Sequence, residues 1–290
     1  MNGAAHTLTL LVLGAGLAAA QPAPPPAAGR LAFRVFNEDH GLANLTVEAL
    51  LQDHVGFLWV GTQNGLYRFD GRTFASFGRE AGFKSTRVFA LHEAADGTLY
   101  VGTRAGLARR EGAGFHHLTP ADGVPESSIV GIASEGARVY LASQAGLLVG
   151  DGRSFHAEAA PPGASGAATA VCADGGHVYA AYEGLLFERD AEGWRDIGTD
   201  AGLPATERID RVVTDGKGRL FVRTARSLWM RPTPAEFFGA LHQGLPPAAT
   251  SGRLERDAHG EILVPTTRGI ARRVGDSWQM LGRREGLPAD

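Results

Sequence analysis

The chain has 290 residues and a nearly balanced charge, with 28 Lys and Arg against 31 Asp and Glu for a formal net charge of −3. This length and 44% hydrophobic residues suffice for a large core, and the charge balance argues against a nucleic-acid-binding surface. The 40 glycines indicate a turn-rich all-β protein. The single cysteine, Cys172, excludes an internal disulfide and is expected to be a small core residue.

The first 20 residues have the features of a secretory signal peptide. Residues 7–19 form a short apolar run, and three alanines at 18–20 provide a cleavage site. Positive charge ahead of this run is limited to the α-amino group and His6, so a disordered or wrongly assigned start is the alternative. We expect cleavage before Gln21 and a periplasmic or secreted location.

Residues 21–30 are rich in Pro and Ala and are expected to form an extended tether. The remainder, residues 31–290, is expected to be a single propeller domain. It opens with residues 33–36, an apolar stretch that predicts one strand. By its position ahead of the first Gly-Leu turn, this strand should be the outermost strand of a blade whose other three strands are not adjacent in the sequence.

The next stretch, residues 46–77, predicts a four-stranded antiparallel meander. Its second strand, residues 57–62, is apolar, aromatic and β-branched, which suits a buried strand. Asn64-Gly65 and Asp70-Gly71 follow as two hairpin turns, because these residues tolerate positive φ. Trp59 in the second strand is expected to be a core residue.

This unit recurs about every 40 residues, which is the period of a propeller blade with four strands. A Gly-Leu pair opens the third strand of the first repeat, and a similar pair recurs in each later repeat. In each repeat an aromatic residue or leucine lies six or seven residues before the Leu or Ile of this pair. The pairs are Gly65-Leu66, Gly106-Leu107, Gly146-Leu147, Gly184-Leu185, Ser227-Leu228 and Gly269-Ile270. The predicted blades are residues 42–77, 83–118, 124–155, 168–197, 203–238 and 245–281, each with its innermost strand first.

Two ring closures fit this count. A seventh unit begins at Glu285-Gly286-Leu287-Pro288, and the strand at 33–36 lacks inner partners. The chain is therefore expected to be an incomplete seven-bladed ring that lacks three strands, a membrane helix and an output domain. The alternative is a six-bladed ring with residues 33–36 beside the sixth blade or unattached.

The first repeat resembles a known family, the two-component regulator propeller repeat. The resemblance rests on Gly41-Leu42-Ala43-Asn44 and on the run Leu58-Trp59-Val60-Gly61-Thr62 through Gly65-Leu66-Tyr67-Arg68-Phe69-Asp70-Gly71. The second repeat matches well and the others keep the skeleton, so the resemblance extends over about residues 33–290. It implies the extracytoplasmic sensor of a membrane-bound hybrid histidine kinase, or of a regulator that ends in a diguanylate cyclase or a DNA-binding domain.

The sequence carries no catalytic or metal-binding motif that we can identify, and no cofactor is predicted. His116 and His117 are adjacent in a strand and point to opposite faces, so they cannot share one metal ion. Recurring acids sit in Asp-Gly or Asp-x-x-Gly turns, where an Asx-type hydrogen bond explains them. These acids are Asp53, Asp96, Asp174, Asp215 and Asp257.

A ligand-binding face is expected where the turns into the inner strands meet the hairpins between second and third strands. Amides, arginines and a carboxylate at this face could bind a polar small molecule or an oligosaccharide; solvated loops are the alternative. The candidate residues are Asn44, Gln63, Asn64, Arg87, Arg104, Gln144, Glu207, Arg208, Arg226 and Arg268.

Two functional classes follow. The preferred one is a non-enzymatic, exported sensor that binds a ligand or a partner, which could include a second propeller or sensor protomer. The membrane would be reached only through C-terminal parts that the chain lacks. The alternative is a propeller enzyme of the lyase or glycosidase type, for which Glu48, Glu207, Arg208 and Arg87 are the strongest acid and base candidates.

Overall fold

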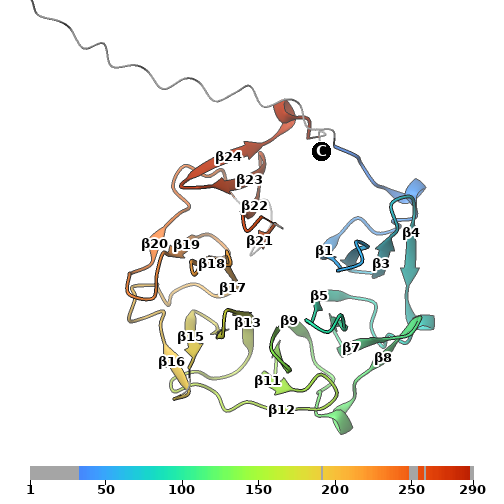
Figure 1. Ribbon diagram of the computed structural model, residues 1–290, viewed down its shortest axis with the longest axis horizontal. Coiled ribbons are helices and arrows are strands. Elements are labelled where there is room, and N and C mark those ends of the chain that lie inside the picture. The colour runs from blue at the N-terminus through green and yellow to red at the C-terminus, as the bar shows by residue number, and fades with distance from the viewer. Residues whose placement is uncertain (1–32, 191, 248–253, 258, 288–290) are drawn as a thin grey trace, which may run out of the picture.

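A computed structural model describes residues 33–190, 192–247, 254–257 and 259–287, so the predicted signal peptide and tether lie outside the described residues. The described chain forms six four-stranded antiparallel sheets arranged as a six-bladed β-propeller (Figure 1), which confirms the predicted all-β fold. Four short 3₁₀ helices are its helical elements. No described helix is both long and apolar enough to span a bilayer.

Each blade consists of four strands that are consecutive in the sequence. Blade 1 is β1 (Val47–Gln52), β2 (Leu58–Thr62), β3 (Gly65–Phe69) and β4 (Phe74–Phe77). Blade 2 is β5 (Val88–Glu93), β6 (Leu99–Thr103), β7 (Gly106–Glu111) and β8 (Gly114–His117). Blade 3 is β9 (Ile129–Glu135), β10 (Arg138–Ser143), β11 (Gly146–Gly150) and β12 (Phe155–Ala157).

The second half of the ring repeats this order. Blade 4 is β13 (Ala168–Asp174), β14 (His177–Tyr182), β15 (Leu185–Arg189) and β16 (Trp194–Asp196). Blade 5 is β17 (Ile209–Thr214), β18 (Leu220–Thr224), β19 (Leu228–Arg231) and β20 (Gly239–Ala240). Blade 6 is β21 (Glu255–Arg256), β22 (Ile262–Thr266), β23 (Gly269–Val274) and β24 (Ser277–Leu281).

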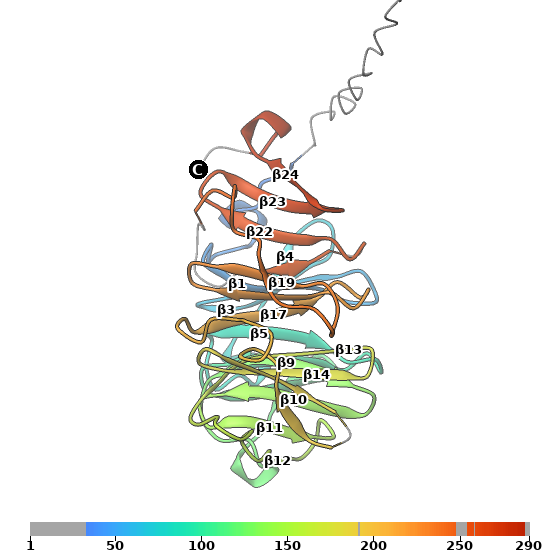
Figure 2. The same ribbon diagram turned by 90° about the vertical axis from the view of Figure 1, so that its left-hand side faces the viewer.

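The first strand of each blade lies innermost, beside the central channel (Figure 1). Seen from the side, the strands run roughly along the ring axis from one face of the disc to the other (Figure 2). The turns between strands are therefore gathered on two opposite faces, and the two faces of each sheet point toward neighbouring blades.

Shared apolar cores join consecutive blades. Between blades 1 and 2, Trp59 and Leu66 pack with Val88, Val101 and other residues of blade 2. Trp59 is fully buried, which confirms its predicted core position. The same packing explains why a glycine stands two residues after Trp59, because a Cβ on Gly61 would lie only 2.5 Å from Cγ1 of Val88.

Cys172 lies at the edge of the core between blades 4 and 5, as predicted for a small packing residue. Burial raises the pKa of its thiol to about 11, so the thiolate that reacts with oxidants and electrophiles is scarce at neutral pH.

The hairpin in blade 1 differs from the prediction. Thr62 pairs with Gly65, so the two loop residues are Gln63 and Asn64 rather than Asn64 and Gly65. Only Gly65 of these has a positive φ, at 137°. The Oγ1 atom of Thr62 accepts the N–H of Asn64 and donates to the carbonyl of Gly65, which stabilises the turn without a second left-handed residue.

The hairpin of blade 4 also differs. Tyr182 pairs with Leu185, and Ala181 pairs with Leu186. Leu186 therefore takes the buried position of Leu66, and assigning Leu185 to it was wrong by one residue. Here the loop does contain a left-handed residue, Glu183 with φ 50°, the one non-glycine residue with positive φ in the described ranges.

A short 3₁₀ turn that ends at a left-handed glycine precedes each of blades 1, 2 and 3 and also follows blade 6. These turns are η1 (Glu38–His40), η2 (Arg79–Ala81), η3 (Pro120–Asp122) and η4 (Arg283–Glu285). In each, the N–H of the following glycine returns to the first residue of the turn, for example Gly82 to the carbonyl of Arg79. The glycine recurs because it adopts φ near +80 to +107°.

Residues 33–36 are extended but form no strand in the structure, so the prediction of a strand there was wrong. The physical reason is the missing partner, because a strand needs a neighbour for its hydrogen bonds and no described strand pairs with this segment. Its side chain Phe36 still packs edge-on against Phe69 and Phe74 of blade 1.

Candidate functional site

One face of the disc carries the hairpins between second and third strands together with the residues that lead into the inner strands; we call it the hairpin face. Backbone hydrogen bonds hold the two sets together. The N–H of Gln63 donates to Thr46 at 3.2 Å, and that of Arg104 donates to Arg87 at 3.0 Å. The predicted ligand residues of these two kinds therefore share this face.

In blades 1 and 2, two of these side chains converge on one carboxylate. Gln63 donates from Nε2 to Oε1 of Glu48 at 3.2 Å, and Nη2 of Arg87 lies 3.4 Å from the same oxygen. Asn64 lies beside them, with its Oδ1 3.4 Å from Oγ1 of Thr86. Since Glu48 is mostly buried and Arg87 is half-exposed, the guanidinium is the group that this cluster presents to solvent.

Other candidates hold the loops in place. Oδ1 of Asn44 accepts the N–H of Thr46 at 3.0 Å, an Asx turn that orients the chain as it enters β1. Glu207 accepts a hydrogen bond from the hydroxyl of Thr224. The remaining arginines and amide are exposed and spread over separate blades, with no side-chain hydrogen bond or ion pair among the described residues. They are Arg104, Gln144, Arg226 and Arg268.

Blade 5 contains the strongest charged cluster of this face, and the sequence prediction included only part of it. Nε of Arg208 lies 3.7 Å from Oδ1 of Asp210 on β17. Arg223, on the neighbouring strand β18, is only 3% exposed, and its Nε has no hydrogen-bond partner. Burial of a guanidinium without a complete set of hydrogen-bond acceptors lowers the stability of the fold, so we expect this arginine to have a functional role.

Arg223 breaks the repeat pattern. It pairs with Arg211 and Leu228, as Gly61 of blade 1 pairs with Ala49 and Leu66. The same position holds glycine or alanine in blades 1 to 4: Gly61, Gly102, Ala142 and Ala181. This substitution of arginine for a small residue is visible in the aligned repeats and could have identified the site.

The charged groups of this cluster influence one another's pKa values. Burial raises the pKa of Asp210, while the charges of Arg208 and Arg223 act in the opposite direction. Burial lowers the pKa of Arg223, and the carboxylates of Asp210 and Glu207 counteract this. The cluster thus consists of partly desolvated arginines and carboxylates that lie close to one another. Such a cluster is suited to bind a polar or anionic group.

The opposite face, which carries the first-to-second and third-to-fourth strand turns, has the recurring aspartates. Asp53 accepts the N–H of Phe57 and also the indole N–H of Trp59, each at 2.8 Å. Asp257 accepts the N–H of His259 and of Glu261. These contacts confirm a structural role for both carboxylates in their turns. In the described chain, no group of three His, Cys, Asp or Glu side chains could hold a metal ion.

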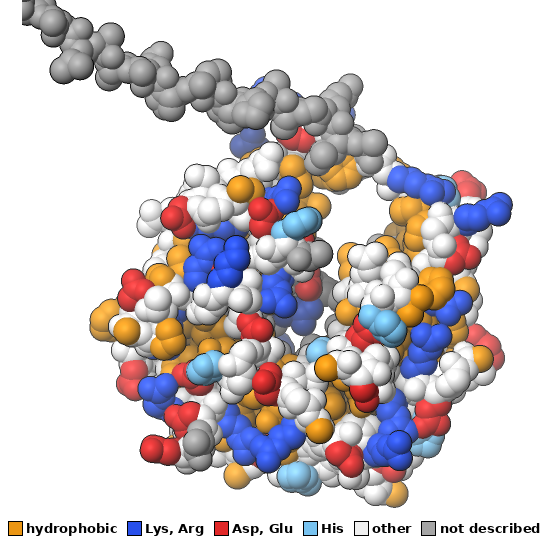
Figure 3. Space-filling model, viewed as in Figure 1, with side chains coloured by type: hydrophobic (Ala, Val, Ile, Leu, Met, Phe, Trp, Pro, Cys, Tyr) orange, Lys and Arg blue, Asp and Glu red, His pale blue; other side chains and the backbone are white. Residues whose placement is uncertain are grey.

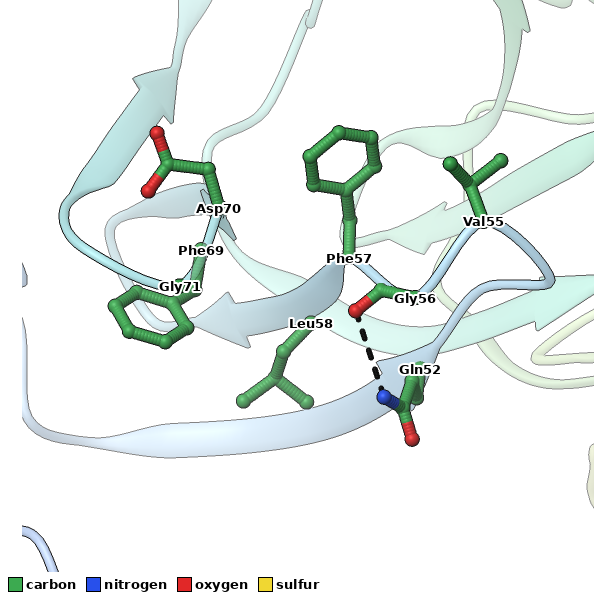
Figure 4. Close-up of a pocket in the computed structure, with 8 residues that line it drawn as sticks. All are labelled: Gln52, Val55, Gly56, Phe57, Leu58, Phe69, Asp70 and Gly71. Carbon is green, nitrogen blue, oxygen red and sulfur yellow. Dashed lines mark hydrogen bonds between the residues drawn. The ribbon is translucent and has the colours of Figure 1, made fainter.

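A pocket of about 460 Å³ opens on blade 1 at this opposite face (Figure 4). Leu58 and Phe69 line one side of it, and the turns at Val55–Phe57 and at Asp70-Gly71 line the other. Across the pocket the amide of Gln52 donates to the carbonyl of Gly56 at 3.4 Å. None of the predicted ligand residues contributes to this mainly apolar pocket.

A partly buried histidine joins blades 2 and 3 near the channel. Nε2 of His92 lies 2.8 Å from the hydroxyl oxygen of Ser134. Burial lowers the pKa of His92 to about 4, with a smaller opposing effect from the charge of Glu93. The imidazole therefore stays neutral in the folded protein at neutral pH.

This predicts an acid-sensitive stability. Between pH 6.5 and 4 the unfolded chain protonates His92 and the folded chain does not, so the unfolded state binds more protons and stability falls with falling pH. The loss attributable to His92 should be about 2–3 kcal/mol, from about 1.4 kcal/mol per pKa unit. Urea unfolding at several pH values should show that the free energy of unfolding falls less steeply with falling pH for His92→Gln than for the parent. The exposed His156→Gln is the control and should behave as the parent does. Equal pH dependence of His92→Gln and the parent would contradict the prediction.

Comparison with known proteins addresses the fold and the first repeat. The family model described as two component regulator propeller matches residues 41–64, which confirms the resemblance of the first repeat. No curated protein matches the sequence. Two similar solved structures are extracellular domains of putative hybrid two component systems from B. thetaiotaomicron, BT3049 and BT4673.

The domain of BT3049 has a TM-score of 0.69 and 17% identity, over 85% of this chain and 35% of that chain. The domain of BT4673 has a TM-score of 0.65 and 16% identity, over 83% and 34%. The present chain thus spans about a third of their length. A streptogramin B lyase is also similar, with a TM-score of 0.62 and 12% identity over 85% of each chain.

At these identities the structural matches show the fold alone, and the family match adds the kind of repeat. The chain is therefore a six-bladed β-propeller whose residues 41–64, which lead into and form part of blade 1, match the two component regulator propeller model.

Proposed function

We propose that this chain is the exported sensory part of a two-component-type signal-transduction protein, truncated before its membrane helix and output domain, and that it binds a polar ligand at the hairpin face. The observation that carries the binding role is Arg223, a buried arginine in place of a small residue, with an unpaired Nε beside Asp210 and Glu207. The family match and the extracellular domains with the same fold support the sensory role.

A binding role is favoured over catalysis by how the candidate acids are engaged. Glu48 is held by Gln63 and Arg87, and Glu207 accepts from Thr224. Such fixed carboxylates suit recognition of hydroxyl and amide groups, as in an oligosaccharide, more than proton transfer.

The binding site can be tested by substitution of Arg223. Arg223→Ala installs the residue type that Ala142 and Ala181 already have at this position, so the backbone accommodates it, and urea unfolding measures the stability lost with the buried side chain. Binding of an oligosaccharide found by screening the parent protein with a glycan array should weaken at least tenfold, measured by calorimetry.

Arg72→Ala is the matched control, since this exposed arginine lies in the turn between β3 and β4, on the opposite face. Equal binding by Arg223→Ala and the parent would exclude the proposed site. Turnover of the glycan that is lost in Asp210→Asn would instead establish the enzyme class.

Export is tested separately. If residues 1–20 are a signal peptide, the protein recovered from the periplasm or medium of a bacterial host should begin at Gln21. N-terminal sequencing and intact mass decide this, and a cytoplasmic product that retains residue 1 would contradict it.

A further inference from the structure

In the part of the chain that the structure describes, no shared apolar core joins blade 6 to blade 1. Figure 1 shows wide separation there between β21 and β1, whereas other consecutive inner strands lie close together, and Figure 3 shows an opening that reaches the channel. Five apolar cores join blades 1 to 6 in succession. A sixth core, formed by Leu42, Val60, Tyr67 and Phe74, belongs to blade 1 alone with the segment ahead of it.

That segment, residues 33–42, repeats residues 74–83 position by position. Phe33 and Phe36 correspond to Phe74 and Phe77, and each segment continues into a 3₁₀ turn with a left-handed glycine, Gly41 with φ 90° and Gly82 with φ 103°. Residues 74–77 are the outer strand of blade 1. By this correspondence, residues 33–36 are the outer strand of a blade that precedes blade 1 around the ring.

The packing supports the correspondence. Phe77 packs edge-on against Phe115 of the next blade with ring centroids 5.8 Å apart. Phe36 packs edge-on against Phe74, the equivalent of Phe115, at 5.5 Å. Residues 33–36 thus already occupy the place of an outer strand, although they have no strand to pair with.

The inner strand of blade 1 shows what is missing beside it. Val47 is 38% exposed, whereas the residues at its position in blades 2 to 5 are at most 1% exposed: Val88, Ile129, Ala168 and Ile209. Leu50 is 55% exposed, and its counterpart Leu254 in blade 6 is fully buried. The position of Val47 is thus buried in blades 2 to 5 and exposed in blade 1.

Blade 6 presents the complementary side. Leu263 and Ile270 occupy the positions of Trp59 and Leu66, but they are only partly buried and belong to no shared core. The chain then leaves blade 6 through η4 and Gly286, whose φ of 107° and N–H bond to the carbonyl of Arg283 repeat the turns that lead into blades 1, 2 and 3. The connection to a further blade is thus already formed.

We propose that this opening is the binding site for one more blade of the same repeat. Its three antiparallel inner strands come from the polypeptide that follows residue 290 in the longer protein, and residues 33–36 pair with them as the fourth, outer strand. Apolar side chains of the added strands cover Val47 and Leu50 on one side and Leu263 and Ile270 on the other. This inference concerns ring closure and is independent of the ligand site on blade 5.

The test extends the chain with its own repeat. Leu287 corresponds to Leu42, so a copy of residues 46–72 attached after Asp290 continues the pattern in register. Hydrogen exchange should show at least tenfold slower exchange in residues 33–36 and in β1 than in the parent chain, with a higher Tm and a monomeric mass. A matched control carries Trp59→Ser and Leu66→Ser in the copy only, and should give neither effect.

Unchanged exchange in a folded extended chain would overturn the proposal. A parent chain that forms a stable dimer, with the same protection of β1 from hydrogen exchange, would also overturn the proposal, because a second copy would then occupy the opening. If the extended chain does not fold, spin labels on Leu50→Cys and Glu255→Cys in the parent chain decide. One missing blade places these strands about 20 Å apart, two sheet spacings, and a distance of about 10 Å would show a closed six-bladed ring.

Discussion

Trp59→Ala is expected to lower the free energy of unfolding by about 3–5 kcal/mol, the range for truncating a large aromatic residue in a core. The indole is fully buried between blades 1 and 2, with ring centroids 5.4 Å from Phe77 and 6.1 Å from Phe115. Its Nε1 donates to Asp53, itself only 6% exposed, so the substitution also removes a partner from a buried carboxylate.

Urea unfolding followed by circular dichroism measures this loss. Phe237→Ala is the control, because Phe237 is 71% exposed and its truncation should change stability by no more than about 0.5 kcal/mol. A loss below about 1 kcal/mol for Trp59→Ala would mean that the core between blades 1 and 2 is not packed as described.

Gly123→Ala is expected to cost roughly 4 kcal/mol. Gly123 ends the turn η3 with φ 78°, and a Cβ there would lie 1.7 Å from the carbonyl oxygen of Phe155. Left-handed backbone in a residue with a side chain costs about 1–3 kcal/mol, and the backbone shift forced by overpacking costs a similar amount.

Gly136→Ala separates the two contributions. Gly136 also has a positive φ, 58°, but nothing lies within 4 Å of its would-be Cβ, so only the conformational cost of about 1 kcal/mol remains. Thermal and urea unfolding of both variants should show Gly123→Ala as the less stable protein. Equal losses would indicate that the close approach to Phe155 is absent in solution.

The fold could be predicted because the repeat encodes it locally. A period of about 40 residues with four strands, a buried aromatic at Trp59 and a turn glycine at Gly82 each follow from short-range pattern and backbone conformation. The errors arose where one residue changes the outcome: Thr62 allowed a different hairpin from the predicted Asn64-Gly65 turn, and the one-residue shift at Leu186 depends on Glu183 adopting φ 50°.

The candidate site was harder to predict because it depends on contacts between distant residues. The convergence of Gln63 and Arg87 on Glu48 joins two blades, and no local pattern indicates it. Arg223 was missed because it lies within a strand and not in a loop. The aligned repeats do show arginine where blades 1 to 4 have glycine or alanine, and its burial in the structure then shows that the position is unusual.

The opening between blades 6 and 1 also determines how this molecule comes apart. In a closed ring every blade has two neighbours, but here the blades form a linear array in which each shared core links only one pair. Among the described residues, blades 1 and 6 are each held by a single such core, while blades 2 to 5 are each held by two. Fluctuations that expose backbone amides should therefore begin at the two rims of the opening and penetrate toward blades 3 and 4 only at higher free energy, as fraying does in a solenoid.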